Sequence, residues 1–172
     1  MGLFGFFKKE EEETEDNMGN TIDDELGDIS KDLLTEILDL MGFFNVVKVK
    51  KEDKEFISLE IKGDDLGRII GKEGATLFAL QVILKNILSK KYKRSIQVLI
   101  DANNYLEKRE KLLKKIAYEA ADKAIDSKEK VILKPMFPWE RRIIHLTLQD
   151  SEFVRTESQG KSKERQVVVI PE

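Results

Sequence analysis

Two side chains that can bind an anion stand four residues apart in the second half of the chain, at Arg141 and His145. They share one face if the segment is helical, because positions i and i+4 are neighbours on a helix surface. A guanidinium can donate two hydrogen bonds to one phosphate, and an imidazole can donate to a phosphate or stack on a base. His145 is the only histidine, and a lone histidine beside isoleucines is more often a packed residue. The pair is therefore a candidate nucleic-acid contact, with simple burial as the alternative.

A glycine-rich segment in the first half offers a second candidate phosphate site. A dinucleotide-binding fingerprint needs G-x-G-x-x-G after a strand, and Ile69 stands where its first glycine belongs. A P-loop needs four residues between its glycines and Ser or Thr after its lysine. Here three residues separate Gly67 from Gly71, and Glu73 follows Lys72. Both nucleotide-binding interpretations are therefore disfavoured.

The pattern that remains is G-x-x-G, from Gly71 to Gly74. Without a Cβ, these glycines let a sugar-phosphate backbone approach closely, and amides at the start of the following helix can donate to phosphate. Lys72 adds a positive charge at the tip, and Leu66 and Ile70 are expected to line an adjacent groove for about four unpaired bases. The candidate nucleic-acid-binding residues are thus Arg68, Ile70, Gly71, Lys72, Glu73, Gly74, Arg141 and His145.

Periodicity predicts the elements that must position these residues. A first helix is expected from Ser30, whose hydroxyl can cap it, to Gly42, which can end it. Further helices are expected over residues 66–70, 75–90 and 103–126, and from Pro138 onward. The two long helices are each expected to bury a stripe of apolar side chains. In residues 75–90 the stripe consists of Leu77, Leu80, Val82, Ile83, Leu84, Ile87 and Leu88, and in residues 103–126 of Leu106, Leu112, Leu113, Ile116, Ala117, Ala120, Ala121, Ala124 and Ile125. Strands are expected near residues 47–49, 56–61, 95–100, 131–133 and 166–170, and residues 153–156 are the candidate partner of the last strand. Both halves are therefore predicted to be α+β, joined by a long helix.

The first half resembles a type II KH domain over residues 29–101. The resemblance lies in the Ile-Ile-Gly-Lys-Glu-Gly segment that ends at Gly74, with a short helix before it and a long one after it. It implies two strands before the loop, one strand after it, and binding of single-stranded nucleic acid. Glu73 departs from the pattern, because many such loops carry a basic or neutral residue there.

The second half, residues 102–172, resembles an R-three-H domain, a small single-stranded nucleic-acid binder. The motif is Glu-Arg-Arg-Ile-Ile-His-Leu, from Glu140 to Leu146, in which the resemblance makes Arg141 and His145 the contact pair. Phe137 departs from the pattern, because a capping Asn is common before the proline.

A KH domain followed by an R-three-H domain resembles the bacterial KhpB/Jag family. Family membership implies RNA binding, a role as RNA regulator or chaperone, and a possible partner that is a small KH-only protein or a second copy. Many members of that family also carry an N-terminal Jag domain; we do not recognise one in this sequence, so membrane association through such a domain is not expected.

Charge is distributed unevenly along the chain. Residues 1–45 hold 3 Lys against 13 Asp and Glu, a net charge of −10, whereas residues 46–172 hold 27 Lys and Arg against 20 acidic residues, a net charge of +7. Residues 1–28 are expected to form an acidic, disordered leader, since like charges repel and few apolar residues offset the ordering entropy. A basic folded part behind an acidic leader favours a nucleic-acid partner.

Composition narrows the remaining function classes. The chain has no cysteine, so it lacks thiolate chemistry and fits a cytoplasmic location. No cofactor or metal site is expected, and no nucleophile stands beside an orienting base, so an enzyme is disfavoured. Glu140 with His145, or the Asp64–Asp65 pair, would be the candidates for acid–base or metal chemistry. The main alternative is a protein-interaction adaptor that dimerises through residues 33–41 or through Phe43 and Phe44.

Overall fold

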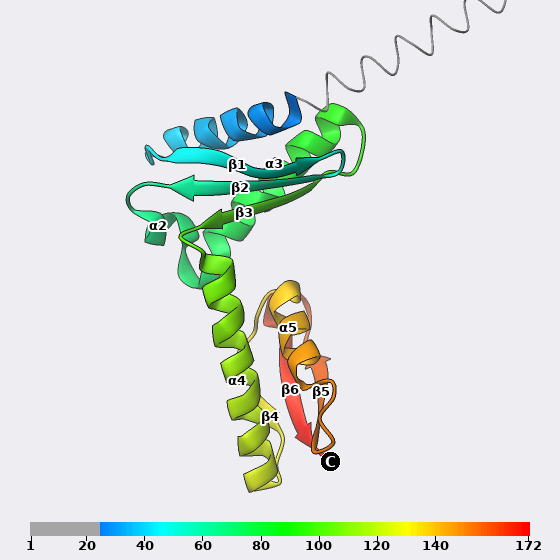
Figure 1. Ribbon diagram of the computed structural model, residues 1–172. Coiled ribbons are helices and arrows are strands. Elements are labelled where there is room, and N and C mark those ends of the chain that lie inside the picture. The colour runs from blue at the N-terminus through cyan, green and yellow to red at the C-terminus, as the bar shows by residue number, and fades with distance from the viewer. Residues whose placement is uncertain (1–24) are drawn as a thin grey trace, which may run out of the picture. The chain divides into compact units, whose positions relative to one another are not determined.

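The computed structural model describes residues 25–172, and the chain divides between Tyr105 and Leu106 into two compact units (Figure 1). The expected boundary lay between residues 101 and 102. Most of the acidic leader lies outside the described residues. Residues 25–28, which we assigned to that leader, are helical.

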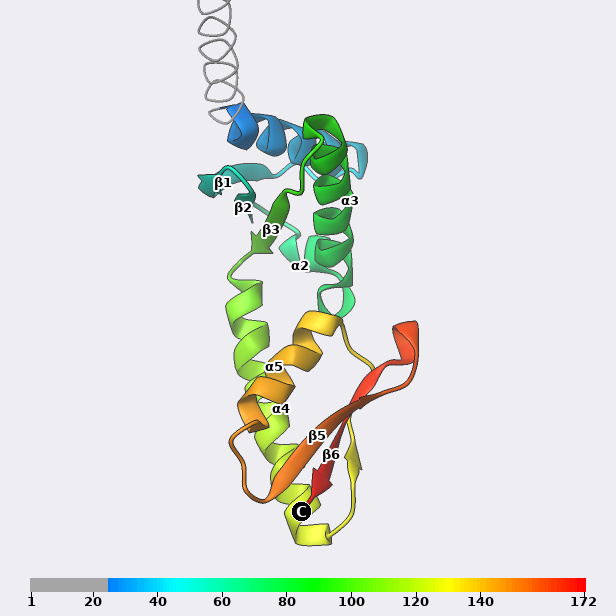
Figure 2. The same cartoon turned by 90° about the vertical axis from the view of Figure 1, so that its right-hand side faces the viewer.

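The first unit contains a three-stranded sheet covered by helices. A helix at residues 25–40 precedes β1 (Val46–Asp53) and β2 (Phe56–Lys62), which form an antiparallel hairpin. The short α2 (Leu66–Ile70), the 3₁₀ turn Lys72–Gly74 and α3 (Ala75–Tyr92) lead to β3 (Gln97–Ala102), which pairs parallel to β2. The sheet order is β1-β2-β3, and α3 lies along one face of the sheet (Figure 2). Two strands before the glycine loop and one after it match the expected type II KH arrangement.

The core of this unit follows from the alternation along β2. Ile57, Leu59 and Ile61 are buried while their neighbours are partly exposed, so one face of the sheet packs against the helices. The residues that meet this face are Leu26, Leu34 and Leu38 of the first helix and Leu77, Leu80, Leu84 and Leu88 of α3.

The predicted stripe of α3 was too broad. Val82, Ile83 and Ile87 are exposed. Apolar residues occur on nearly every side of this helix, and the core contacts only the side that carries the four buried leucines.

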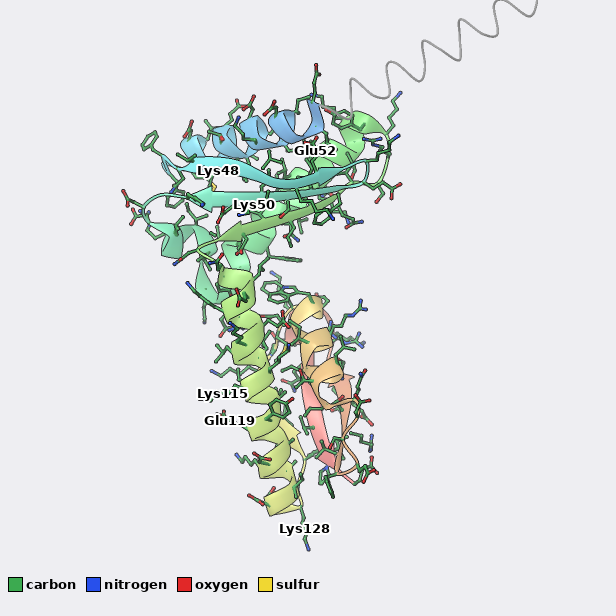
Figure 3. The ribbon with its side chains drawn as sticks, viewed as in Figure 1. Lys48, Lys50, Glu52, Lys115, Glu119 and Lys128 are labelled. Carbon is green, nitrogen blue, oxygen red and sulfur yellow. The ribbon has the colours of Figure 1, made fainter. Side chains whose placement is uncertain are left out.

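The predicted start of the first helix was wrong. Ser30 is buried within the helix, and its hydroxyl donates to the Leu26 carbonyl at 2.6 Å. Near the observed start, the Gly27 amide donates to a Glu52 carboxylate oxygen at 2.6 Å, and Figure 3 shows Glu52 beside this helix. A carboxylate 25 residues away in sequence therefore does what a local cap would have done.

The predicted end of that helix was correct. Gly42 adopts φ +80° and its amide donates to the Asp39 carbonyl at 2.9 Å, which is a conformation that glycine tolerates best. Of the two phenylalanines that follow, Phe43 is buried and Phe44 is exposed.

The second unit packs two helices on a small antiparallel sheet. All but the first residue of α4 (Tyr105–Ser127) belongs to it, and β4 (Val131–Ile132), α5 (Pro138–Leu148), β5 (Val154–Gln159) and β6 (Gln166–Pro171) follow, with a 3₁₀ turn at Ser162–Glu164. The sheet order is β4-β6-β5. The predicted pairing of β6 with residues near 153–156 is confirmed, with Thr156 opposite Val169.

The buried side of α4 is made mostly of alanines. Leu113, Ala117, Ala120, Ala121 and Ala124 pack against Ile144 and Leu148 of α5. Leu112 and Ile125, which we expected in the buried stripe, are exposed. The small alanines let the core come close to the helix backbone, so the contact stripe is narrower than the apolar pattern indicated.

None of the helices that the structure describes is both long and apolar enough to cross a membrane.

Candidate nucleic-acid interface

Arg141 and His145 lie on one face of α5, as their spacing predicted, and meet the same strand. Arg141 donates from a terminal guanidinium nitrogen to the Ser158 hydroxyl at 3.1 Å. The imidazole Nε2 lies 2.8 Å from that hydroxyl, and Nδ1 lies 2.6 Å from the Thr156 hydroxyl. Thr156 and Ser158 are two residues apart on β5, so both side chains face α5. The four side chains form the Arg141–His145 site.

The Arg141–His145 site is positively charged and short of acceptors. The Nε of Arg141 is buried and has no hydrogen-bond partner among the described residues. Burial, together with the charges of Arg141 and Arg165, lowers the pKa of the His145 imidazole from its ordinary value of 6.5. The ring is therefore neutral at neutral pH, and an incoming anion would meet the half-buried guanidinium of Arg141 with no carboxylate among these four side chains.

The hydroxyls of this site can adapt to a ligand. With a neutral ring, Ser158 accepts from Arg141 while it either donates to Nε2 or accepts from it, depending on the tautomer. With a protonated ring, both nitrogens donate, so the hydroxyl hydrogens of Thr156 and Ser158 turn outward. A phosphate oxygen near Arg141 could accept those hydrogens, which makes the arrangement suited to an anionic backbone.

A buried ion pair holds the start of α5, and the sequence alone did not reveal it. Glu140 is 1% exposed; one of its carboxylate oxygens accepts from Nε of Arg109, 12% exposed, at 2.7 Å. The other oxygen accepts from the Phe137 amide at 2.8 Å. Phe137 has no side-chain acceptor to cap the helix, so Glu140 supplies half of a capping box. The sequence did contain a signal for this capping role, because Glu140 stands three residues after Phe137, the residue that precedes the helix. Since Glu140 is engaged in this way, it is not a free partner for acid–base chemistry with His145.

The glycine loop in the first unit takes a tight turn that requires its glycines. Gly71 ends α2 with φ +74°, and an added Cβ would lie 2.2 Å from the Thr76 hydroxyl oxygen. Gly74 has φ +81°, and an added Cβ would lie 2.7 Å from the Tyr105 ring. Both angles fall in the left-handed region that side chains with a Cβ disfavour. The two glycines are therefore needed for the turn itself: the Thr76 side chain packs against Gly71, and the Tyr105 ring packs against Gly74, which is buried.

The start of α3 could bind an acceptor through its backbone amides. Gly74 is the N-cap of this helix and provides no side-chain cap, and the Ala75 amide already donates to the Lys72 carbonyl, so only the following first-turn amides lack an acceptor within the helix. Lys72 is exposed at the tip. Glu73 is exposed in a left-handed conformation with φ +53°, so its carboxylate lies on the loop that would receive a phosphate.

The other two predicted residues differ in their surroundings. Ile70 is half-buried at the end of α2 and packs against the core of the unit. The Arg68 guanidinium lies 5.0 Å from the centre of the Phe43 ring and 3.7 Å from the Asp65 carboxylate. Arg68 thus stands beside the loop with two neighbours of its own, and Asp65, one of the residues considered for metal chemistry, serves as its partner.

In residues 25–172, no group of three or more acidic or histidine side chains is placed to hold a metal ion.

Comparison with known proteins assigns both units. The model of the KhpA/KhpB KH domain matches residues 30–100, and the R-three-H domain model matches residues 111–171. The fold and the two sites thus define a protein with a KH domain followed by an R-three-H domain.

Similar proteins agree with this assignment. The RNA-binding protein KhpB of Clostridium symbiosum is 36% identical over 145 residues, which cover 84% of this chain and 65% of that protein. KhpB of Bacillus subtilis (strain 168) is 33% identical over 121 residues, covering 69% and 58%, and KhpB of Streptococcus pneumoniae (strain D39) is 34% identical over 120 residues, covering 70% and 37%. The chain belongs to the KhpB/Jag family, and it spans less than two thirds of the length of these relatives.

Proposed function

We propose that this chain is a single-stranded RNA-binding protein that contacts the strand with both the Gly71–Gly74 loop and the Arg141–His145 site. It acts without catalysing a reaction, as a cytoplasmic regulator or chaperone of RNA. The relatives that share both domains are named RNA-binding proteins, and the geometry of both sites supports the same role here.

The observation that carries the proposal is the convergence of Arg141 and His145 on Ser158. A buried guanidinium normally has its donors satisfied, because an unmet donor costs about 1–3 kcal/mol. The Nε donor of Arg141 is buried and unmet among the described residues, and a strand phosphate would meet the part of this half-buried guanidinium that stays accessible. The hydroxyls of Thr156 and Ser158 supply further donors, and the strand phosphates supply the acceptors.

Two sites on one chain also explain how weak contacts give useful affinity. The KH loop reads about four nucleotides. When both sites reach the same strand, binding at one raises the effective concentration at the other, so the combined affinity exceeds that of either site.

Fluorescence anisotropy across a salt series tests this proposal. The parent is expected to bind a single-stranded RNA of about twelve nucleotides more tightly than a duplex of the same length, with an affinity that falls as salt rises. Lys72→Asp should weaken binding, whereas Lys128→Asp, which makes the same charge change at the turn after α4 (Figure 3), should have a smaller effect. No binding by the parent at low salt, or equal effects of the two variants, would overturn the proposal.

A second candidate function is that of a protein-interaction adaptor. The exposed Val82, Ile83 and Ile87 on α3 form an apolar surface that favours it. Its partner would be a small KH-only protein or a second copy of this chain. Sedimentation of the purified chain with and without RNA separates the two functions: an adaptor forms a stable protein complex that is independent of RNA and insensitive to salt.

A further inference from the structure

The R-three-H unit contains a pocket of about 590 Å³ that adjoins the Arg141–His145 site. It lies between the C-terminal end of α5, the loop that follows, and β5. His145 and Thr156 line the pocket and also belong to the Arg141–His145 site, so the two are continuous. Small-ligand pockets commonly have volumes of about 300–1,000 Å³.

We propose that this pocket receives one unpaired nucleobase of the strand whose phosphate is held by Arg141. The inference rests on the proposed function and adds a base-binding subsite to it. Because each base of a strand is attached next to its own phosphate, a pocket that shares a wall with a phosphate site is placed to take the adjoining base.

The floor and wall of the pocket suit a flat, largely apolar group. Leu148 and Val154 are buried lining residues, and Leu146 lines the pocket with 51% of its surface exposed. The His145 ring stands at the side shared with the Arg141–His145 site, where an imidazole can stack on a base. These surfaces offer contact area to a base face.

The charges around the pocket disfavour a second phosphate and favour base edges. The carboxylates of Glu152 and Glu172 line it, and Arg155 lies 3.4 Å from Glu172 and also pairs with Glu157. An anion would be repelled by these carboxylates, since the nearby arginine is already neutralised. Carboxylates and the Gln149 amide can instead accept hydrogen bonds from the amino and ring N–H groups of a base.

A cycle of two strands and two leucine variants tests the inference in the full chain. One strand is a single-stranded RNA of about eight nucleotides, and the other is a ribose-phosphate chain of the same length and charge that carries no bases. Leu146→Ala should weaken binding of the intact RNA about fivefold, because less apolar surface is buried against the base, and leave the abasic strand unchanged. Leu112→Ala truncates a leucine of similar exposure, 46%, on α4, and should change neither affinity.

The outcomes separate this inference from the proposed function. Arg141→Ala should weaken both strands, because it removes a phosphate contact. If Leu146→Ala weakens neither strand, or both equally, while Arg141→Ala weakens both, the base pocket is wrong and the proposed function stands. If the parent binds neither strand, the proposed function itself fails.

Methyl resonances give a measurement that needs no variant. Leu148 and Val154 lie against the pocket, so their methyl signals should shift when intact RNA is added and remain in place with the abasic strand. Equal shifts with both strands, or none with either, would contradict an occupied base pocket.

Discussion

Replacing Arg109 with methionine should destabilise the R-three-H unit by about 3 kcal/mol. The change removes the cation 2.7 Å from Glu140 and leaves a carboxylate that is 1% exposed without its charged partner. Breaking a buried pair by removing one member costs about 3–5 kcal/mol. The lower end applies here, because the Phe137 amide still donates to the second oxygen of Glu140. Methionine keeps most of the apolar stem of arginine, so the loss reports the charge and its hydrogen bond.

Urea unfolding followed by tryptophan fluorescence measures this loss in the right unit. Trp139 is the only tryptophan, and it packs against the core of the R-three-H unit. Lys115→Met is the matched control: Lys115 pairs with Glu119 at 3.6 Å on the exposed face of α4 (Figure 3), and exposed pairs contribute about 0–1 kcal/mol.

A double variant shows whether the charge is responsible. Arg109→Met combined with Glu140→Gln should be more stable than Arg109→Met alone by about 1 kcal/mol or more, since glutamine leaves no buried charge. If Arg109→Met is no more destabilising than Lys115→Met, the reasoning about the buried pair is refuted.

Four further predictions concern single residues. Gly74→Ala should destabilise the KH unit by about 2 kcal/mol or more, from left-handed strain and overlap with Tyr105, whereas Gly67→Ala, whose Cβ meets nothing within 4 Å, should be neutral or stabilising in thermal unfolding followed by circular dichroism. Because the folded-state pKa of His145 is lowered, its contribution to stability is fully present above pH 6.5 and is lost as pH falls below it; urea titrations of the parent and His145→Gln should differ in that slope, and equal slopes would contradict the neutral ring. RNA affinity of the parent should instead rise as pH falls, because a bound phosphate favours the imidazolium. Glu73→Gln should tighten RNA binding about threefold at low salt by removing a like charge, and an unchanged affinity in anisotropy titrations would show that the loop does not meet a phosphate.

Local spacing predicted those parts of the molecule that depend on neighbours in sequence. The i, i+4 relation predicted that Arg141 and His145 share one face of α5. The helix that ends before Gly71 and the longer one that follows were also predictable, because glycine interrupts the periodic pattern.

Contacts between distant segments could not be predicted in the same way. Ser158 contacts Arg141 only because β5 lies beside α5. The position of β5 is in turn set by its register against β6. Glu52 holds the first helix from a strand, so the local Ser30 signal was misleading. Which side of α3 is exposed depends on which side of the helix packs against the sheet. The residue types of α3 alone do not determine that choice.

The most direct test of the central claim compares Arg141→Ala with Arg142→Ala in RNA binding. Each variant removes one positive charge from α5, but Arg142 is exposed and lies off the face that meets Ser158. Arg141→Ala should lower the affinity for single-stranded RNA about tenfold or more and reduce the salt slope by about 1, whereas Arg142→Ala should change the affinity by about threefold or less. Equal affinities for the two variants would contradict the claim that the Arg141–His145 site holds the strand.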